Sequence, residues 1–304
     1  MSPLAQKLQA LREASPSGAQ PGGLIETGVP GVTFFWDESP SPRSPLLYSS
    51  GLVIIGQGRK IGYLGGRRFQ YDADTCLLLG VPVPFECEVE ASPEAPLLGV
   101  RLDIDQPQLH ALVARYQDQL GFTDARGAAH AGVEPLPLEG PLLGALLRLL
   151  DSLRDPIDRE VLGAAALDEI VYRVLRSEHG RVLYALTQHQ TPYAHVSQAL
   201  MRIHKDYQQA LTVEELARES AMSVSSFHRA FKQVTGETPL QYLKKLRILK
   251  AKALLIFEGL RVEEAAFEVG YGSASQFSRE FKRYFKVPPS EAATLPYSDV
   301  LQSA

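Results

Sequence analysis

The chain has 304 residues, of which 45% are hydrophobic and 22% are charged, and its formal net charge is −4. This length and composition indicate a globular protein of about two domains, and they exclude a disordered tail, a collagen and a disulfide-stapled miniprotein. The charge is divided unevenly: residues 196–304 carry 15 Lys and Arg against 12 Asp and Glu, whereas residues 1–195 carry 16 against 23. The imbalance predicts different partners for the two halves.

Residues 1–23 are expected to be a flexible N-terminal segment, in which a short helix precedes a connector rich in Pro and Gly. Between residues 24 and 104, short apolar runs are separated by Gly, Pro and Asp at intervals of about 8–12 residues, a spacing typical of a β-sandwich or β-barrel. Apolar and charged residues alternate most clearly at residues 85–90 and 98–105, which indicates strands with one solvated face.

After Asp105 the period of the apolar residues changes from 2 to about 3.6, so helices follow the strands. A first helix ends near residue 120, a loop covers residues 121–137, and leucine-rich helices are predicted at 141–153 and 157–178. These two helices could form a dimer surface or cover the barrel, and the pattern does not decide between the two roles. The whole segment 24–190 is interpreted as a domain for effector sensing and dimerisation.

Residues 212–239 and 261–289 resemble each other, at an offset of 49 residues in the first block and 50 in the second. The offset changes where a turn is expected in each unit. The repeat predicts two helix-turn-helix units, 212–233 and 261–285, within an all-helical domain at 193–292 that is followed by a tail at 293–304. A helix from Thr238 to about residue 257 is expected to join the units, and its lysines and arginine are either a solvated face or phosphate contacts.

The second helix of each unit is expected to bury paired phenylalanines and to present a polar face. Arg can bind guanine bidentately, Gln can bind adenine, and Lys contacts phosphate, so such a face suits the major groove of DNA. The candidate DNA contacts are Ser225, Ser226, His228, Arg229 and Lys232 in the first unit, and Ser275, Gln276, Ser278, Arg279 and Lys282 in the second.

The segment 196–290 closely resembles the AraC/XylS type of bacterial transcription regulators. The resemblance lies in Ser-Val-Ser-Ser-Phe-His-Arg-Ala-Phe-Lys at 223–232 and Gly-Tyr-Gly-Ser-Ala-Ser-Gln-Phe-Ser-Arg-Glu-Phe-Lys at 270–282. It implies that the second helix of each unit enters the major groove of promoter DNA, and it adds Ala274 to the candidate contacts. Residues 56–60, 69–72 and 91–96 resemble the N-terminal domain of one AraC-type subgroup, which implies a cupin-like β-barrel followed by helices used for pairing.

Side chains expected to point into the barrel are the candidates for binding a small-molecule effector. They are Phe34, Trp36, Tyr63, Phe69, Tyr71, Phe85 and Cys87. Their character favours an apolar or aromatic effector. No metal and no cofactor are expected, because all seven histidines lie outside the predicted strands. Cys76 and Cys87 are interpreted as small buried hydrophobic residues, and the competing hypothesis is that one of them senses an oxidant or electrophile.

These observations predict an α+β protein that acts as a DNA-binding transcription regulator, an activator that works as a homodimer and contacts RNA polymerase. No catalysis is expected. No segment approaches the roughly 18 consecutive apolar residues of a membrane helix and the start lacks a signal-peptide pattern, so we expect a cytoplasmic protein with no membrane partner. One alternative is a cupin-like enzyme acting on small molecules with an appended helical domain. Another is a helical adaptor that contacts protein instead of DNA.

Overall fold

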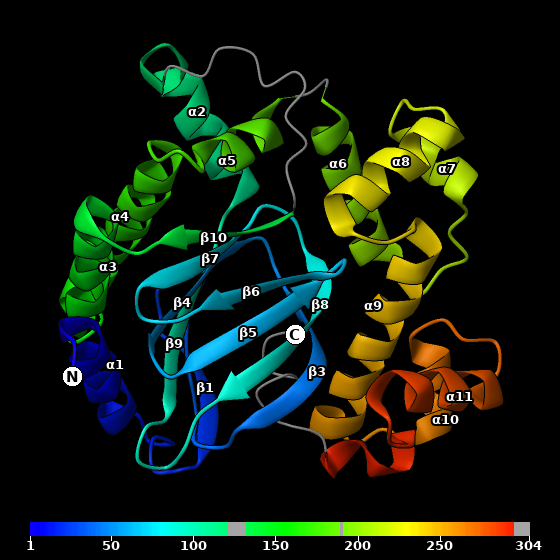
Figure 1. Ribbon diagram of the computed structural model, residues 1–304, viewed down its shortest axis with the longest axis horizontal. Coiled ribbons are helices and arrows are strands. Elements are labelled where there is room, and N and C mark those ends of the chain that lie inside the picture. Colours follow the sequence, from blue (N-terminus) through cyan, green and yellow to red (C-terminus); the bar gives the residue numbers. More distant parts are fainter. Residues whose placement is uncertain (121–131, 189–190, 295–304) are drawn as a thin grey trace.

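The computed structural model describes residues 1–120, 132–188 and 191–294. The N-terminal part consists of strands and helices, and the C-terminal part is helical (Figure 1). The strands are β1 (Gly22–Glu26), β2 (Val32–Asp37), β3 (Ser41–Tyr48), β4 (Gly51–Gln57), β5 (Arg59–Leu64), β6 (Arg67–Tyr71), β7 (Thr75–Leu79), β8 (Val83–Glu90), β9 (Leu97–Asp103) and β10 (Val133–Pro137). The helices of this part are α1 (Pro3–Ala14), α2 (Gln106–Leu120), α3 (Gly140–Ser152), α4 (Pro156–Leu175) and α5 (Gly180–Thr187).

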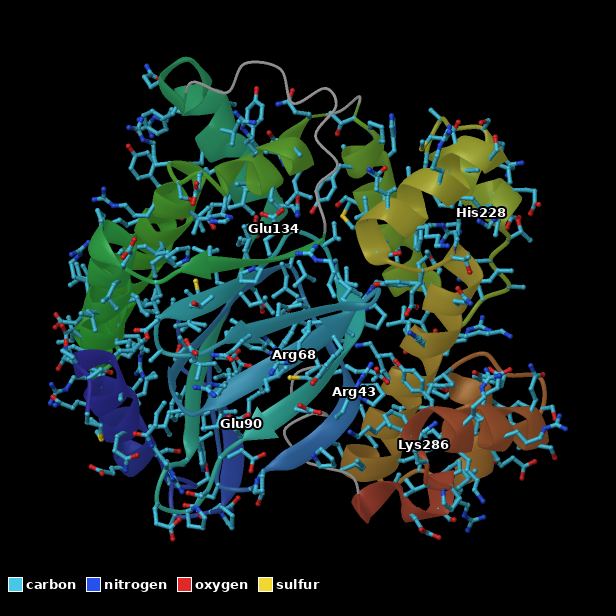
Figure 2. The ribbon with its side chains drawn as sticks, viewed as in Figure 1. Arg43, Arg68, Glu90, Glu134, His228 and Lys286 are labelled. Carbon is cyan, nitrogen blue, oxygen red and sulfur yellow. The ribbon has the colours of Figure 1, made fainter. Side chains whose placement is uncertain are left out.

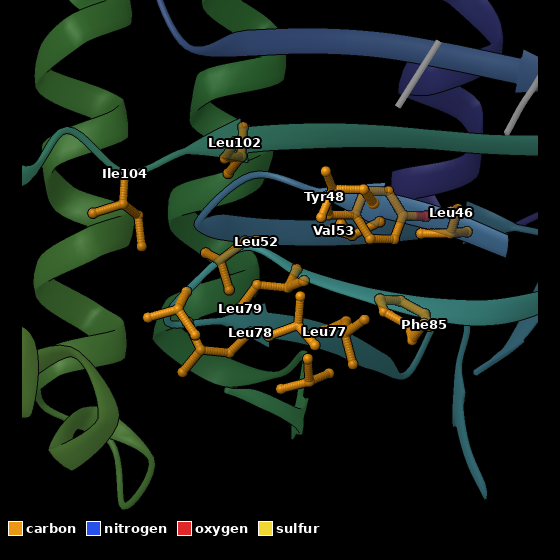
Figure 3. Close-up of a cluster of buried hydrophobic side chains, with 14 of the residues drawn as sticks. Leu46, Tyr48, Leu52, Val53, Leu77, Leu78, Leu79, Phe85, Leu102 and Ile104 are labelled. Atoms are coloured by element: carbon orange, nitrogen blue, oxygen red, sulfur yellow. The ribbon is translucent and has the colours of Figure 1, made fainter. Parts of the chain in front are cut away.

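Two antiparallel sheets form the N-terminal barrel-like sandwich. The larger sheet has the strand order β1-β2-β9-β4-β7-β10, and the smaller sheet has the order β3-β8-β5-β6. The inner faces of the two sheets meet in an apolar core that contains Leu46, Tyr48, Val53, Leu77 and Phe85 (Figure 3). The expected α+β architecture with an N-terminal β domain is therefore confirmed.

The N-terminal segment is part of this domain and is not a flexible arm. Helix α1 buries Leu4 and Leu8 against the larger sheet, and Gly56 on β4 lets them approach, because a Cβ there would lie 2.4 Å from Leu8 Cδ1. The connector after α1 is tied down by Arg12, whose guanidinium donates to the carbonyl oxygens of residues 18 and 20 and pairs with Glu38 at 2.6 Å. The prediction of flexibility was wrong because it weighed the Pro- and Gly-rich composition and not the buried arginine.

The last five residues of the segment 121–137, which was predicted to be a loop, form a strand. Residues 121–131 lie outside the described part of the chain, but β10 pairs antiparallel with β7 over its whole length, with Leu136 opposite Cys76. Two prolines in this strand, Pro135 and Pro137, reduce its strand signal. They are tolerated because β10 is the outermost strand of its sheet, where a ladder hydrogen bond is needed on one side only.

Helices α3 and α4 form a pair beside α1 and cover the outer face of the larger sheet (Figure 1). Most of the leucines of α3 are buried, and so are Ile170 and Val174 of α4. The first turns of α4 leave Ile157, Val161 and Leu162 exposed, at 72%, 67% and 50% of their surface. Covering the barrel is thus one role of these helices, and α4 also has an unpartnered apolar stripe.

The C-terminal part follows as a series of helices. They are α6 (Pro192–Asp206), α7 (Val213–Glu219), α8 (Val224–Thr235), α9 (Pro239–Ala253), the π-helical turn η1 (Leu254–Glu258), α10 (Val262–Glu268), α11 (Ala274–Phe285) and the 3-10 turn η2 (Pro289–Thr294). Helix α9 begins with a capping box made by Thr238 and Gln241 and lies along β3 and β8 (Figure 1). It separates the α7–α8 unit from the α10–α11 unit.

Candidate nucleic-acid interface

The two helix-turn-helix units have equivalent backbones. The turn after α7 closes with a hydrogen bond from the Met222 amide to the Ala217 carbonyl, and the turn after α10 closes with the same bond from Tyr271 to Ala266, both at 2.9 Å. Each second helix is twelve residues long. Each begins at a serine, Ser223 or Ser273, whose hydroxyl accepts from an amide three residues on.

The units differ at two corners where the backbone is left-handed. The corner between the helices is Ala221 with φ +52° in the first unit and Gly270 with φ +85° in the second. The end of the second helix is Gly236 with φ +78° in the first unit and Lys286 with φ +67° in the second. Each unit thus has one glycine and one residue with a side chain in a conformation that favours glycine.

The phenylalanine pairs form the cores of the units. Phe227, Phe231, Phe277 and Phe281 are fully buried, and the rings within each pair lie 5.5 Å apart. Apart from Lys232, which lines a cavity beside the β domain, the predicted polar faces therefore point outward, and Figure 2 shows His228 on the side of the molecule away from the sheets. The exposed candidates are Ser225, Arg229, Lys232, Ser275, Gln276, Arg279 and Lys282, and the half-buried ones are Ser226, His228, Ala274 and Ser278.

Arg229 and Arg279 occupy equivalent positions on the two second helices. Both are exposed, and neither makes a hydrogen bond or an ion pair with any described residue. An unpaired guanidinium keeps all of its donors available for an acceptor from another molecule. The two arginines are thus the best placed of the candidate residues to bind a base edge or a phosphate.

The cations of α9 are not available to DNA in the same way. Lys252 is fully buried, Arg247 donates to the carbonyl oxygens of Tyr207 and Gln209, and Lys245 forms an ion pair with Glu237. Most of this positive charge is used to hold the helices of the C-terminal part together. Neither of the two interpretations, a solvated face or phosphate contacts, therefore fits Lys252, Arg247 and Lys245.

Lys232 lies at the boundary between the two parts of the chain. A cavity of about 280 Å³ separates α8 from β5, β6 and β10, and its lining includes Arg67, Phe69, Lys232 and Val234. Beside the cavity, the amide of Gly132 donates to the carbonyl oxygen of Val234 at 3.0 Å. A main-chain hydrogen bond thus connects the first unit to the N-terminal domain, and Lys232 faces this contact.

A second junction between the domains runs through Tyr242 of α9. Its hydroxyl donates to the carbonyl oxygen of Pro82 at 2.9 Å and lies 2.6 Å from Nε2 of His204 on α6. The hydroxyl has one hydrogen and the proline carbonyl can only accept, so Nε2 of His204 must carry the proton of the neutral ring. Burial, reinforced by the charge of Lys250, lowers the pKa of His204 to about 4.

This lowered pKa predicts that the protein loses stability in mild acid. An unfolded histidine binds a proton below about pH 6.5, whereas His204 in the folded chain does so only near pH 4, so stability falls as the pH decreases through that window. Between pH 7 and pH 5 the loss from this group is about 2 kcal/mol. Urea unfolding followed by circular dichroism measures it, with His204→Gln as the control that keeps a donor to Tyr242 but does not titrate. Equal losses in both proteins would contradict the assignment.

Only part of the predicted effector set points into the barrel. Phe69, Tyr71, Phe85 and Cys87 lie on the inner face of the smaller sheet, where the register places Gly62 opposite both Phe69 and Cys87. Tyr63 directly follows Gly62 on β5, so its side chain points to the opposite, outer face of the sheet. There its hydroxyl donates to Glu88. The expectation that Tyr63 points inward is therefore wrong.

Phe34 and Trp36 face the helices and not the barrel interior. They stack on each other with ring centroids 5.5 Å apart, and Trp36 Nε1 donates to the Gln20 carbonyl beneath α1. The neighbouring Phe35 points into the barrel instead, and the centroid of its ring lies 5.5 Å from Lys60 Nζ. All six residues of β2 are buried because both faces of the larger sheet are covered, and so burial alone could not indicate which face is inner.

The barrel interior also holds polar groups that were not predicted. Lys60 is fully buried, and its Nζ donates to the Tyr48 hydroxyl at 3.0 Å. A hydrogen-bonded chain continues through Tyr71 to Cys87 Sγ, with distances of 3.2 and 3.3 Å. Burial raises the pKa of both tyrosines, which keeps them neutral. Lys60 lies two residues before Gly62 and therefore points to the same face, but the prediction that Tyr63 points inward placed Lys60 on the outer face, and a lysine is rarely assigned to a core.

The two cysteines are both buried. Burial raises the pKa of the Cys76 thiol to about 12, which keeps it protonated and unreactive at neutral pH. This environment favours the interpretation of Cys76 as a small hydrophobic residue. Across the described ranges, no group of three or more His, Cys, Asp or Glu residues is arranged to hold a metal ion, and no helix is long and apolar enough to cross a membrane.

Sequence comparison relates both parts of the chain to known proteins. The family model described as "AraC-type transcriptional regulator N-terminus" matches residues 28–182, about half of the chain. The chain belongs to the AraC-type transcriptional regulators. A second family model, a helix-turn-helix domain, matches residues 216–294 of this AraC-type regulator.

Curated relatives of the AraC-type regulator match it over about one third of its length. The transcriptional activator RhaS of Klebsiella pneumoniae is 35% identical over 98 residues, which are 32% of this chain and 35% of RhaS. The regulator AlkR of Acinetobacter baylyi is 40% identical over 94 residues, 31% of each chain. The chain thus covers only about a third of the length of these relatives.

Solved structures of ToxT from Vibrio cholerae share the fold of the AraC-type regulator over most of its length. An apo ToxT variant has a TM-score of 0.58 at 12% identity and covers 86% of this chain and 97% of its own. ToxT with a bound unsaturated fatty acid has a TM-score of 0.55 at 12% identity, with 87% and 96% covered. The arrangement of a β domain followed by two helix-turn-helix units is therefore shared with ToxT.

Proposed function

We propose that this AraC-type regulator binds promoter DNA through α8 and α11 and thereby controls transcription. The observation that carries the proposal is the pair of equivalent, exposed and unpaired arginines, Arg229 and Arg279, on two helices of the same length. Helix α9 between the units has 15 residues and is about 22 Å long, a spacer of the size needed to place two helices in major grooves about 34 Å apart.

Selection of bound duplexes from a random pool by the purified full chain tests this function. We expect one motif with two blocks separated by about one helical turn, roughly 10 base pairs, because two different helices read successive grooves. A selection at physiological salt with no enriched sequence would contradict the proposal and favour the adaptor that contacts protein. Bound metal or turnover of a small molecule would instead favour the enzyme.

We infer that an effector binds in the cavity between the domains. The apolar side chains of Leu64, Phe69 and Val133 and the cations Arg67 and Lys232 suit a molecule with an apolar body and a carboxylate. The fatty acid bound to ToxT supports this chemical class. Of the other predicted effector residues, Tyr71, Phe85 and Cys87 lie deeper in the barrel than Phe69. Phe34 and Trp36 face the helices, and Tyr63 is on the outer face of the smaller sheet.

The effector proposal is tested on the selected motif. Oleate is expected to change the affinity of the wild-type chain for the motif several-fold and to leave that of the Arg67→Gln variant unchanged, because Arg67 lies outside the DNA-reading helices. An equal response of both proteins, or no response of either, would exclude the cavity as the site.

We also propose that the chain acts as a homodimeric activator in the cytoplasm and contacts RNA polymerase. The exposed apolar stripe of Ile157, Val161 and Leu162 on α4 supports pairing of two chains. Sedimentation of the Val161→Glu variant is expected to show a smaller particle than the wild type, with Arg154→Glu as the control outside the stripe. Equal sedimentation of all three proteins would place any dimer contact elsewhere.

A further inference from the structure

The side chain of Gln276 is held by a neighbour on its own helix. Gln276 is exposed on the first turn of α11, and its Nε2 donates to Oε1 of Glu280, one turn further on, at 3.2 Å. An ionised carboxylate accepts hydrogen bonds and donates none. The end of the Gln276 carboxamide that faces Glu280 must therefore be its amino group, and this contact fixes which way the carboxamide is turned.

Glu280 is itself fixed by two other elements. Tyr271, in the turn before α11, donates its hydroxyl to Glu280 Oε2 at 2.9 Å, and Lys244 of α9 lies 3.6 Å from Oε1. Burial opposes ionisation of Glu280, but the hydrogen bonds from Gln276 and Tyr271 and the charge of Lys244 outweigh it and lower the pKa. Glu280 is thus a charged acceptor at neutral pH, and it is anchored in the body of the second unit.

The contact with Glu280 decides which base edges Gln276 can match. One N–H of the carboxamide is used, so the group offers a second N–H and the oxygen Oε1. Adenine presents one acceptor, N7, and one donor, N6–H, in the major groove, whereas guanine presents two acceptors, N7 and O6. One donor beside one acceptor complements adenine. A carboxamide with both N–H groups available could also approach guanine.

We propose that Glu280 is a positioning residue that makes the second recognition helix read adenine in preference to guanine through Gln276. The proposal rests on the function proposed above, namely DNA binding through α8 and α11. The first unit lacks this arrangement, because Ser226 and Ala230 occupy the positions equivalent to Gln276 and Glu280. The second unit alone carries it.

Duplex selection with four variants of the full chain tests the proposal. Gln276→Ala identifies the base pair that Gln276 reads, because the preference at that position disappears. At the same position, Glu280→Ala is expected to reduce the preference for adenine over guanine about tenfold, while the preferences at other positions stay the same. Glu280→Met, which keeps the length of the side chain but has no strong acceptor, is expected to give the same result and replaces Glu280→Ala if that variant is unfolded by circular dichroism.

The control is Glu263→Ala on α10, which removes an equal charge from an exposed site without touching Gln276. It is expected to raise the affinity for all duplexes alike and to leave every base preference unchanged. An unchanged preference in the Glu280 variants, a uniform loss of preference at all positions, or a motif in which Gln276 reads a base other than adenine would each overturn the proposal. A wild-type chain that selects no sequence would instead refute the proposed function itself.

Discussion

Replacing Gly270 by alanine is expected to destabilise the second helix-turn-helix unit by about 3 kcal/mol. Two effects add at this position. The backbone has φ +85°, which L-residues with a side chain adopt at a cost, and a Cβ would lie 2.2 Å from the carbonyl oxygen of Gln208. That oxygen belongs to the main chain of the segment after α6, so it cannot move aside as the end of a flexible side chain could.

Hydrogen exchange of the amides of α10 and α11 measures this change locally, and protection there is expected to fall about a hundredfold. The matched control is Ala221→Gly at the equivalent corner of the first unit. There the alanine already has φ +52°, so glycine is expected to stabilise the first unit slightly, by about 0.5 kcal/mol. Equal protection of α10 and α11 in the Gly270→Ala variant and the wild type would show that the contact with Gln208 is not close in solution.

Replacing Arg229 or Arg279 by alanine is expected to weaken binding to the selected motif by about 1–3 kcal/mol each. Neither guanidinium has a partner among the described residues, so the loss reflects contacts with DNA and not a broken ion pair in the protein. Affinity for the motif, measured by fluorescence anisotropy at constant salt, is expected to decrease between about fivefold and 150-fold for each variant.

A lysine variant at Arg279 separates base recognition from charge. Arg279→Lys keeps the positive charge but loses the planar pair of donors, so it is expected to retain part of the affinity and to relax the base preference. Arg181→Ala on α5 removes one exposed positive charge away from α8 and α11 and is the control for net charge. Equal losses for Arg181→Ala and Arg279→Ala would mean that the arginine on α11 acts through general charge alone.

The positions of the DNA-reading helices could be predicted because their signals are local. Ser223 and Ser273 cap the helices, the phenylalanine pairs recur at a fixed offset, and Thr238 followed by Pro239 starts α9. These features depend on residues within one or two turns, so the predicted ends of the two units, residues 233 and 285, lie within two residues of the observed ends of α8 and α11.

The parts that could not be predicted depend on contacts distant in sequence. Helix α1 decides which face of β2 points into the barrel, because its Arg12 lies 5.9 Å from the Trp36 ring on the other face. The sequence of β2 alone does not indicate this contact. Similarly, helical spacing alone allows the hydrogen bond between Gln276 and Glu280, but the contact of Glu280 with Lys244 depends on the packing of α9 against α11, and its contact with Tyr271 depends on the turn before α11. The periodicity of apolar residues thus indicates which residues share a face of a strand or helix, but contacts between distant segments decide which element that face packs against.

The two left-handed corners show that the turn geometry of the units does not depend on one residue type. Gly236 and Lys286 share one backbone conformation, and so do Ala221 and Gly270, although the residues of each pair differ. The path of the main chain is thus equivalent in both units, while each unit has one corner at which a side chain is held in a conformation that favours glycine. Glycine at both corners of both units is therefore the arrangement with the least backbone strain in this domain.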